Sequence, residues 1–306
     1  MDDWTGSIPG WRRLRSLKAK YLKHYMNPYL FKHESSLISA KDMENALRRL
    51  NADQCDVLYI HTGMQFGMPN LQLGRSGVLE GLAAILYGLG VSTLLMPTYT
   101  FSFCNAELFD VAKSPSSMGA LNEFMRIKHR WIRSCDPLMS NILYGEERGL
   151  ITKIGKQSVG EGSTFDLLSR SGLKVKFLFL GPRIHECFTY MHYLEAIKQV
   201  PYRYNFIFDG TIVDGERTYK EEYSLFIRDE GVTAGSGAKI FENIMIERHI
   251  ARCERVGGGT VTVVDLEQAR DTYLDLLALS PNFYIEEVFM EPIRPSSFAP
   301  RKMVAL

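Results

Sequence analysis

Two short apolar segments on either side of one helix-length segment constrain the fold of this chain more than any other feature. "DVLYIHTG" (56–63) and "STLLMPTYT" (92–100) are typical of strands buried on both faces. Between them, "VLEGLAAILYGLG" (78–90) has the pattern of a buried helix and closes at Gly90. A strand, a helix and a second strand in this order usually form a parallel pair, so we predict an α/β sheet.

Further segments extend this sheet. "KVKFLFLG" (174–181) predicts a third buried strand, and "TVTVVDLEQARDTYLDLLAL" (260–279) predicts a strand followed by a helix. From about Pro201 the pattern predicts antiparallel strands with Asp-Gly turns at 209–210 and 214–215. The expected fold is therefore a mixed, largely parallel central sheet flanked by helices, with an antiparallel insertion in the C-terminal half. Helices are also expected at 38–50, capped by Ser36 or Ser39, and at 118–129 and 234–253. A short helix at 162–172 is expected to be capped by Ser163 or Thr164 and to end at Gly172.

We divide the chain into a basic N-terminal extension, residues 1–35, and a single domain, residues 36–306. The extension contains "WRRLRSLKAKYLKHYMNPYL" (11–30), which is basic and rich in aromatic residues. We favour a helix that packs on the domain over one that lies on a membrane surface, since most helices are amphipathic. A stretch of about 20 apolar residues, as a membrane span requires, is absent from the sequence.

The charge balance favours small-molecule partners. The chain has 306 residues, with 36 basic against 35 acidic side chains and a net charge of +1, so no excess charge attracts a nucleic acid polymer. The five cysteines are scattered and form no C-x-x-C pair, which favours reduced thiols and a cytoplasmic protein. The seven dispersed histidines give no metal signature, and a homo-oligomer is compatible with all of these observations.

Common nucleotide-binding and hydrolase motifs are missing. The sequence contains neither a G-x-x-x-x-G-K-[ST] loop nor a G-x-G-x-x-G turn after a strand. It also lacks the G-x-S-x-G elbow of many serine hydrolases. In "LQLGRSG" (71–77), Gln72 stands too close to Gly74 for the pyrophosphate loop of the commonest N-acetyltransferase superfamily.

The segment "CFTYMHYLE" (187–195) holds Thr189, His192 and Glu195 at three-residue intervals. On a helix these side chains share one face, because residues i and i+3 are neighbours. The segment follows a predicted strand, where open α/β sheets place their ligand sites. A histidine beside a carboxylate can act as a general base, although by itself the same pattern is also an ordinary helix face.

Six segments in a fixed order resemble those of the aminoglycoside 3-N-acetyltransferase family, also called the antibiotic N-acetyltransferase family. None of the six is specific alone, but together they cover roughly residues 36–280. They are "HTGMQFG" (61–67), "MPTYT" (96–100), "SMGAL" (117–121), "RSCDPLMS" (133–140), "GEGSTFDLL" (160–168) and "TYMHYLE" (189–195).

The resemblance implies acyl transfer, by default of an acetyl group, from coenzyme A to a primary amine, with acetyl-CoA as donor and no metal. It implies that His192 is the base, that Glu195 or another carboxylate orients it, and that Thr189 donates a hydrogen bond to the thioester oxygen. The predicted cofactor contacts are His61, Thr62, Gly63, Met64, Gly67, Thr98, Ser117, Met118 and Gly119.

Departures from the family pattern concern the substrate. Asp136 replaces the histidine of an "RS-x-HP" loop, and Ser117 replaces the arginine before Met-Gly. The 200–229 segment is similar to members associated with bacterial surface polysaccharides, which favours a nucleotide-linked amino sugar over an antibiotic. The alternatives are aminoglycoside resistance and a non-catalytic ligand-binding homologue. The candidate substrate contacts are Asp136 as a counter-charge to the amine, Tyr202 and Glu186; Tyr202 and Tyr204 are alternatively core aromatics.

Overall fold

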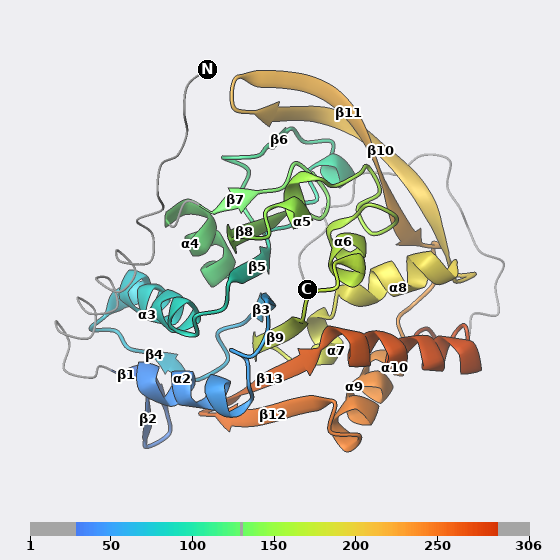
Figure 1. Ribbon diagram of the computed structural model, residues 1–306. Helices are drawn as coiled ribbons and strands as arrows, with labels where there is room; N and C mark the ends of the chain where they lie inside the picture. The colour runs from blue at the N-terminus through green and yellow to red at the C-terminus, as the bar shows by residue number, and fades with distance from the viewer. Residues whose placement is uncertain (1–28, 129–130, 287–306) are drawn as a thin grey trace.

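The structure, a computed structural model, describes residues 29–128 and 131–286. A seven-stranded mixed sheet runs through the molecule in the order β12-β13-β9-β3-β5-β8-β7 (Figure 1). Its strands are β3 (Val57–Thr62), β5 (Thr93–Pro97), β7 (Ile132–Arg133), β8 (Asn141–Gly145), β9 (Val175–Gly181), β12 (Ala251–Val256) and β13 (Gly259–Asp265).

The predicted mixed α/β sheet is confirmed, but the parallel pairing expected for most of the sheet is confined to its centre. β3 pairs in parallel with both β5 and β9, as the strand–helix–strand pattern predicts. The outer strands β13 and β8 pair antiparallel with β9 and β5. The carboxyl ends of β9, β3 and β5 therefore lie side by side, which brings three separate loops to one edge of the sheet.

Alternation along the strands divides the core into two layers. In β3, Val57 and Tyr59 face one cluster of buried side chains, whereas Leu58 and Ile60 face the other. The second cluster is covered by α2 (Ala40–Arg49), α3 (Gly74–Gly88) and α4 (Ala120–Lys128). The first cluster is covered by α5 (Gly149–Thr152), α6 (Thr164–Arg170), α7 (Ile184–Cys187), α8 (Tyr190–Lys198), α9 (Gly237–Glu247) and α10 (Leu266–Leu279).

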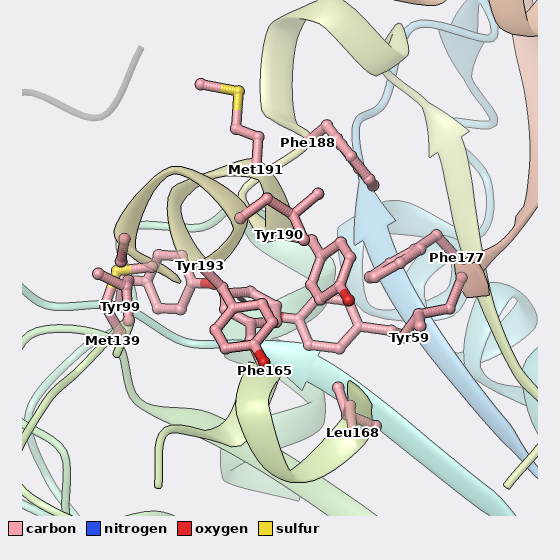
Figure 2. Packing of buried hydrophobic residues seen from close by; sticks show 14 of the residues in the cluster. Tyr59, Tyr99, Met139, Phe165, Leu168, Phe177, Phe188, Tyr190, Met191 and Tyr193 are labelled. Carbon is pink, nitrogen blue, oxygen red and sulfur yellow. Dashed lines mark hydrogen bonds between the residues drawn. The ribbon is translucent and has the colours of Figure 1, made fainter. Parts of the chain in front are cut away.

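Aromatic side chains dominate the first cluster. Figure 2 shows Tyr59 and Phe177 of the sheet gathered with Phe165 of α6 and Tyr190 of α8. Tyr190 lies with its ring centroid 5.3 Å from that of Phe177 and 5.7 Å from that of Phe165. Such ring pairs add about 1 kcal/mol each beyond their buried area. The cluster therefore anchors α8 firmly against the sheet.

A long hairpin arches over the outer side of the molecule near α8 (Figure 1). It consists of β10 (Arg203–Asp214) and β11 (Arg217–Arg228), and it pairs in parallel with β6 (Phe109–Asp110). The turn predicted at Asp214-Gly215 is confirmed, with Gly215 at φ 62°. The turn predicted at 209–210 is wrong: Gly210 lies within β10, and a Cβ there would come within 2.6 Å of the Phe103 ring. Gly210 is therefore needed for close packing of Phe103.

The N-terminal boundary differs from the prediction. Tyr29–His33, placed in the extension, forms β1, which pairs with β2 (Ser36–Ser39) and β4 (Met68–Pro69). Leu30 and Phe31 are fully buried in the core, so this end of the extension is part of the fold. The expected helix at 11–30 lies largely outside the described residues. A 3-10 turn at Phe103–Asn105 completes the structure.

Two predicted helices are refined. Ser39, rather than Ser36, caps α2 by accepting from the Asp42 amide, and the Asp42 carboxylate in turn accepts from the Ser39 backbone amide. The helix expected at 234–253 ends at Glu247, and the chain continues into β12. Among residues 29–128 and 131–286, no helix has both the length and the apolar character needed to cross a membrane.

Candidate active site

His192 and Glu195 lie together on α8, as predicted, and 30% of the His192 side chain is exposed. The Glu195 side chain is fully buried, and Nδ1 of His192 is 3.7 Å from its Oε2. This separation is too long for a hydrogen bond. The two side chains are therefore neighbours without being directly bonded.

Arg203, at the start of β10, lies between them. Its Nε is 2.6 Å from Glu195 Oε2, and one of its terminal nitrogens is 3.1 Å from His192 Nδ1. The Arg203 side chain is 6% exposed, so this ion pair is shielded from solvent. Sequence inspection missed Arg203, because its place beside α8 depends on how the hairpin folds back.

Two further groups hold Glu195. The hydroxyls of Tyr202 and Tyr273 donate to its Oε1 at 2.5 and 3.0 Å. Burial alone raises the pKa of a carboxyl, but His192, Arg203 and Tyr202 outweigh it and lower the pKa of Glu195 to about 2. Glu195 is therefore ionised at neutral pH. Tyr202, predicted as a substrate contact, is 4% exposed and is occupied by Glu195, in agreement with the alternative of a core aromatic.

His192 is held in its neutral form. Burial, followed by the positive charge of Arg203, lowers the pKa of His192 below its usual value, although Glu195 opposes this. Arg228, at the end of β11, acts in the same direction. A neutral imidazole has a nitrogen lone pair, which a general base requires.

Thr189 ends a chain of hydroxyl groups that starts at the sheet. Tyr59 donates to Asn141 Oδ1 at 2.7 Å, and the Asn141 amide is oriented by its own donation to the Met139 carbonyl. Tyr99 is 2.9 Å from Tyr59 and 3.2 Å from Thr189, oxygen to oxygen. We call Asn141, Tyr59, Tyr99 and Thr189 the hydroxyl relay.

The relay has one consistent direction. Since the proton of Tyr59 goes to Asn141, Tyr99 must donate to Tyr59, and Thr189 must then donate to Tyr99. The proton of Thr189 is thereby engaged, and its oxygen offers lone pairs to the site. If Thr189 donated to the thioester oxygen, as predicted, the hydrogen bonds of the relay would have to reverse. If Thr189 accepted a hydrogen bond from an amine, the relay could stay as it is.

The predicted cofactor segments meet at the strand ends. A Cβ on Gly119 would lie 3.8 Å from the Thr62 carbonyl oxygen, and the Gly63 amide donates to Leu180 of β9 at 2.8 Å. The Ser117 amide donates to the Tyr99 carbonyl at 2.9 Å, which connects the 117–119 segment to the relay. Met64 and Met118 pack as partly buried side chains beside these segments.

His61 is a buried imidazole at the end of β3. Burial lowers its pKa to about 3, and its ring stacks on Phe179 with centroids 5.2 Å apart. Within residues 29–128 and 131–286, its Nε2 has no hydrogen-bond partner. A buried polar atom without a partner is unusual. The unpaired Nε2 of His61 is therefore compatible with a ligand such as coenzyme A at the adjacent 62–63 segment.

Other predicted contacts serve the fold instead. Thr98 is fully buried on Ser140, and Gly67 packs against Lys32 of β1 with φ at 138°. Asp136 is 5% exposed and accepts from the Leu138 and Met139 amides and from Ser158, each at 2.9 Å. Burial raises the pKa of Asp136. All three bonds fall on Oδ1, so Asp136 stabilises its own loop, and its contact with an amine stays a prediction.

Glu186 also differs from its predicted role. It is exposed on α7, and its carboxylate accepts from the Arg183 amide at 2.8 Å, which caps that short helix. Another residue missed from the sequence is Asn122, which accepts from Thr62 and donates to the Pro97 carbonyl at 2.7 Å. It ties α4 to the ends of both β3 and β5. Its polar side chain on an apolar helix face was the available signal.

Comparison with known proteins identifies the family. Residues 60–278 match the family model of aminoglycoside 3-N-acetyltransferase. The chain belongs to the aminoglycoside 3-N-acetyltransferase family. Members of this family are acetyl-CoA-dependent N-acetyltransferases, so the recognition from six ordered segments is confirmed. A search of curated proteins gave no match.

Several solved structures share the fold. One is AAC-IIIb in a binary complex with CoASH, at a TM-score of 0.66 and 17% identity, covering 78% of this chain and 96% of that one. Another is AAC-VIa bound to sisomicin, at a TM-score of 0.66 and 18% identity, covering 78% and 97%. YokD from Bacillus subtilis gives a TM-score of 0.63 at 15% identity, covering 86% and 98%. At these identities the likeness establishes the fold.

Proposed function

We propose that this family member acetylates a primary amine on a nucleotide-linked amino sugar, with His192 as the general base. The observation that carries the proposal is a neutral, partly exposed imidazole beside a buried carboxylate and an arginine on α8. Acetyl-CoA supplies the acetyl group as a thioester. The chain's own residues supply proton transfer, orientation and exclusion of water.

The chemistry follows from the charge of an amine. A primary amine on a sugar is largely protonated near neutral pH and must lose a proton before it can attack. His192 can accept that proton through Nε2, since its pKa lies below the operating pH and leaves it neutral. The imidazolium that forms is then stabilised by Glu195, which stays ionised. Thr189 would accept a hydrogen bond from the amine and orient it.

Two loops are suited to hold coenzyme A: one follows β3 and the other precedes α4. The 62–63 and 117–119 segments approach each other closely, and both contain a glycine. Their small residues permit backbone contact with the pantetheine and phosphates. Among the described residues, no group of three or more His, Cys, Asp or Glu side chains could hold a metal ion.

The charges around His192 favour an anionic substrate. The groups that act on its pKa include two arginines, Arg203 and Arg228, and the carboxylate of Glu195, which is already paired with Arg203. Arg228 is exposed and available to a ligand phosphate. Since Arg203 is neutralised by Glu195, a polycationic aminoglycoside would meet the uncompensated like charge of Arg228 here. A nucleoside diphosphate attached to an amino sugar carries the complementary charge, as in surface polysaccharide synthesis in the cytoplasm.

The test is an assay of thiol release from acetyl-CoA. We expect turnover with nucleoside-diphosphate amino sugars and little with aminoglycosides, and we expect His192→Gln to lower kcat/KM by at least 100-fold. The matched control is His249→Asn, which changes an exposed histidine with positive φ. Undiminished turnover by folded His192→Gln would refute the base. Turnover with aminoglycosides alone would replace the proposed substrate with the antibiotic.

A second variant tests the charge argument. Arg228→Gln should lower kcat/KM about tenfold for a nucleotide-linked amino sugar and much less for the same amino sugar without its nucleotide. Arg217→Gln, at the other end of β11 and paired with Asp214, is the control. An equal effect of Arg228→Gln on both substrates would place the phosphates elsewhere.

A further inference from the structure

The contact between Arg203 and His192 determines which nitrogen of the imidazole carries the proton. A guanidinium has five N–H donors and no acceptor, so it can only donate. Its nitrogen lies 3.1 Å from Nδ1 of His192. Nδ1 must therefore accept, and in a neutral ring the proton then resides on Nε2.

The alternative ring arrangements fit less well. Rotating the ring by 180° would turn a C–H group toward the guanidinium and lose the contact. Placing the proton on Nδ1 would set two donors against each other at 3.1 Å. A bond from Nδ1 to Glu195 Oε2 would require the present 3.7 Å to shorten by at least half an ångström.

We infer that Arg203 is a positioning residue that holds His192 in the Nε2–H tautomer, and that the base form arises when Nδ1 exchanges Arg203 for Glu195. In the Nε2–H tautomer, the exposed nitrogen is a donor and cannot take a proton from an amine. After the exchange, Nδ1–H donates to Oε2 and Nε2 has a free lone pair. The protons are exchanged with solvent: Nδ1 takes one up from water, which gives a transient imidazolium beside Glu195, and Nε2 then releases one to water. The ring is therefore neutral before and after the exchange.

The surroundings make such an exchange a small movement. Oε2 is the oxygen of Glu195 that faces both Arg203 and His192, while Oε1 is fixed by the two tyrosines. Arg203 also donates to the Phe226 carbonyl of β11 at 3.2 Å, so it stays attached to the hairpin when it releases Nδ1. His192 is faced by charges from three elements: Glu195 of α8, Arg203 of β10 and Arg228 of β11.

This inference rests on the proposed base role of His192, but its test is independent of activity. In protein labelled with 15N-histidine, two-bond 1H–15N correlation spectra distinguish the two tautomers, and the His192 signal is assigned by its loss in His192→Gln. We expect the Nε2–H pattern in the free wild-type protein. An Nδ1–H pattern would overturn the inference and leave the base role intact. Retained turnover by His192→Gln would overturn the base role instead.

Variants separate positioning from simple structural support. Arg203→Gln removes the positive charge, so the titration midpoint of His192, followed by the same spectra, should move to higher pH. Arg203→Lys keeps the charge and should leave the midpoint much closer to that of the wild type. An unchanged midpoint in folded Arg203→Gln would contradict the inferred contact. If either variant fails to fold, because Glu195 loses its partner, the wild-type spectrum still decides the tautomer.

Discussion

At the residue scale, Glu195 is the most constrained side chain of the candidate site. A buried carboxylate is costly unless other groups compensate its charge, and here an arginine and two tyrosine hydroxyls do so. The same contacts keep Glu195 ionised, so that it can stabilise a positive charge on His192. Stability and chemistry therefore depend on one group, and the pH dependence of folding should reveal it.

We expect Glu195→Gln to lower the free energy of unfolding by about 3 kcal/mol at pH 7, because it leaves Arg203 buried without a counter-charge. The folded pKa of about 2 lies below the ordinary value of 4.5, so the charge of Glu195 stabilises the fold above about pH 4.5. That contribution is lost as pH falls toward 2. Urea unfolding at several pH values should show the gap between wild type and variant closing in acid.

The matched control for this measurement is Glu222→Gln, on the exposed side of β11. It should change the free energy of unfolding by less than about 0.5 kcal/mol. A constant gap between wild type and Glu195→Gln across the acid range would show that Glu195 does not have a lowered pKa.

The hydroxyl relay leads to a second prediction at this scale. Tyr99→Phe removes the acceptor of the Thr189 proton and should lower kcat/KM about tenfold, with a stability loss of about 1 to 2 kcal/mol. Tyr193→Phe is a suitable control, since its hydroxyl bonds to Asp166 at 3.0 Å in the same aromatic cluster. Steady-state kinetics and thermal unfolding of both variants would test this. Equal activity losses would mean that the relay acts only through packing.

At the scale of elements, the helices that begin at predicted caps show how much local sequence specifies. Ser163 caps α6 and Ser39 caps α2, each by accepting from an amide three residues later. Gly172 follows α6 with φ at 71°, as a helix-ending glycine should. Gly210 could not be assigned in this way, because an Asp-Gly pair has the same local preference whether or not a distant ring packs on it.

The two candidate caps of α2 provide a direct test. Ser39→Ala should lower the free energy of unfolding by about 1 kcal/mol, because the Asp42 amide loses its acceptor and the Asp42 carboxylate loses the donation from the Ser39 hydroxyl. Ser36→Ala, at an exposed position of β2, should have an effect below about 0.5 kcal/mol. Chemical denaturation of the two variants would measure this. A larger effect of Ser36→Ala would place the helix start elsewhere.

At the scale of the whole molecule, the site exists because three strands end together. β9 leads into α7 and α8 (Figure 1), whereas β3 leads into the 62–63 segment and β5 leads into Tyr99. The backbones of β3 and β9 nearly touch where they end. A Cβ on Gly181 would lie 2.6 Å from the Gly63 carbonyl oxygen, and Gly181 has φ at 108°. Only a glycine permits this approach.

We therefore expect Gly181→Ala to destabilise the fold by more than about 2 kcal/mol and to reduce activity in whatever fraction stays folded. Gly90→Ala is the control: it also has positive φ, at 77°, but has no atom within 4 Å of the added Cβ. It should cost only about 1 kcal/mol. Thermal unfolding of both variants would separate backbone strain from steric overlap. Equal losses of stability in the two variants would show that the added Cβ at position 181 does not overlap with Gly63.

Local patterns in the sequence were sufficient for the central parallel strands, the helix starts, the six ordered segments and the pairing of His192 with Glu195. Each of these depends on residues that are close in sequence or on a fixed order along the chain. The tertiary structure alone decided which contacts act on them. Tyr273 bonds to Glu195 across 78 positions and Tyr99 to Thr189 across 90, and Arg203 reaches His192 only because the hairpin folds back. Hydrogen-bond direction and proton position depend on such contacts, so spacing alone identified the catalytic candidates but not their protonation.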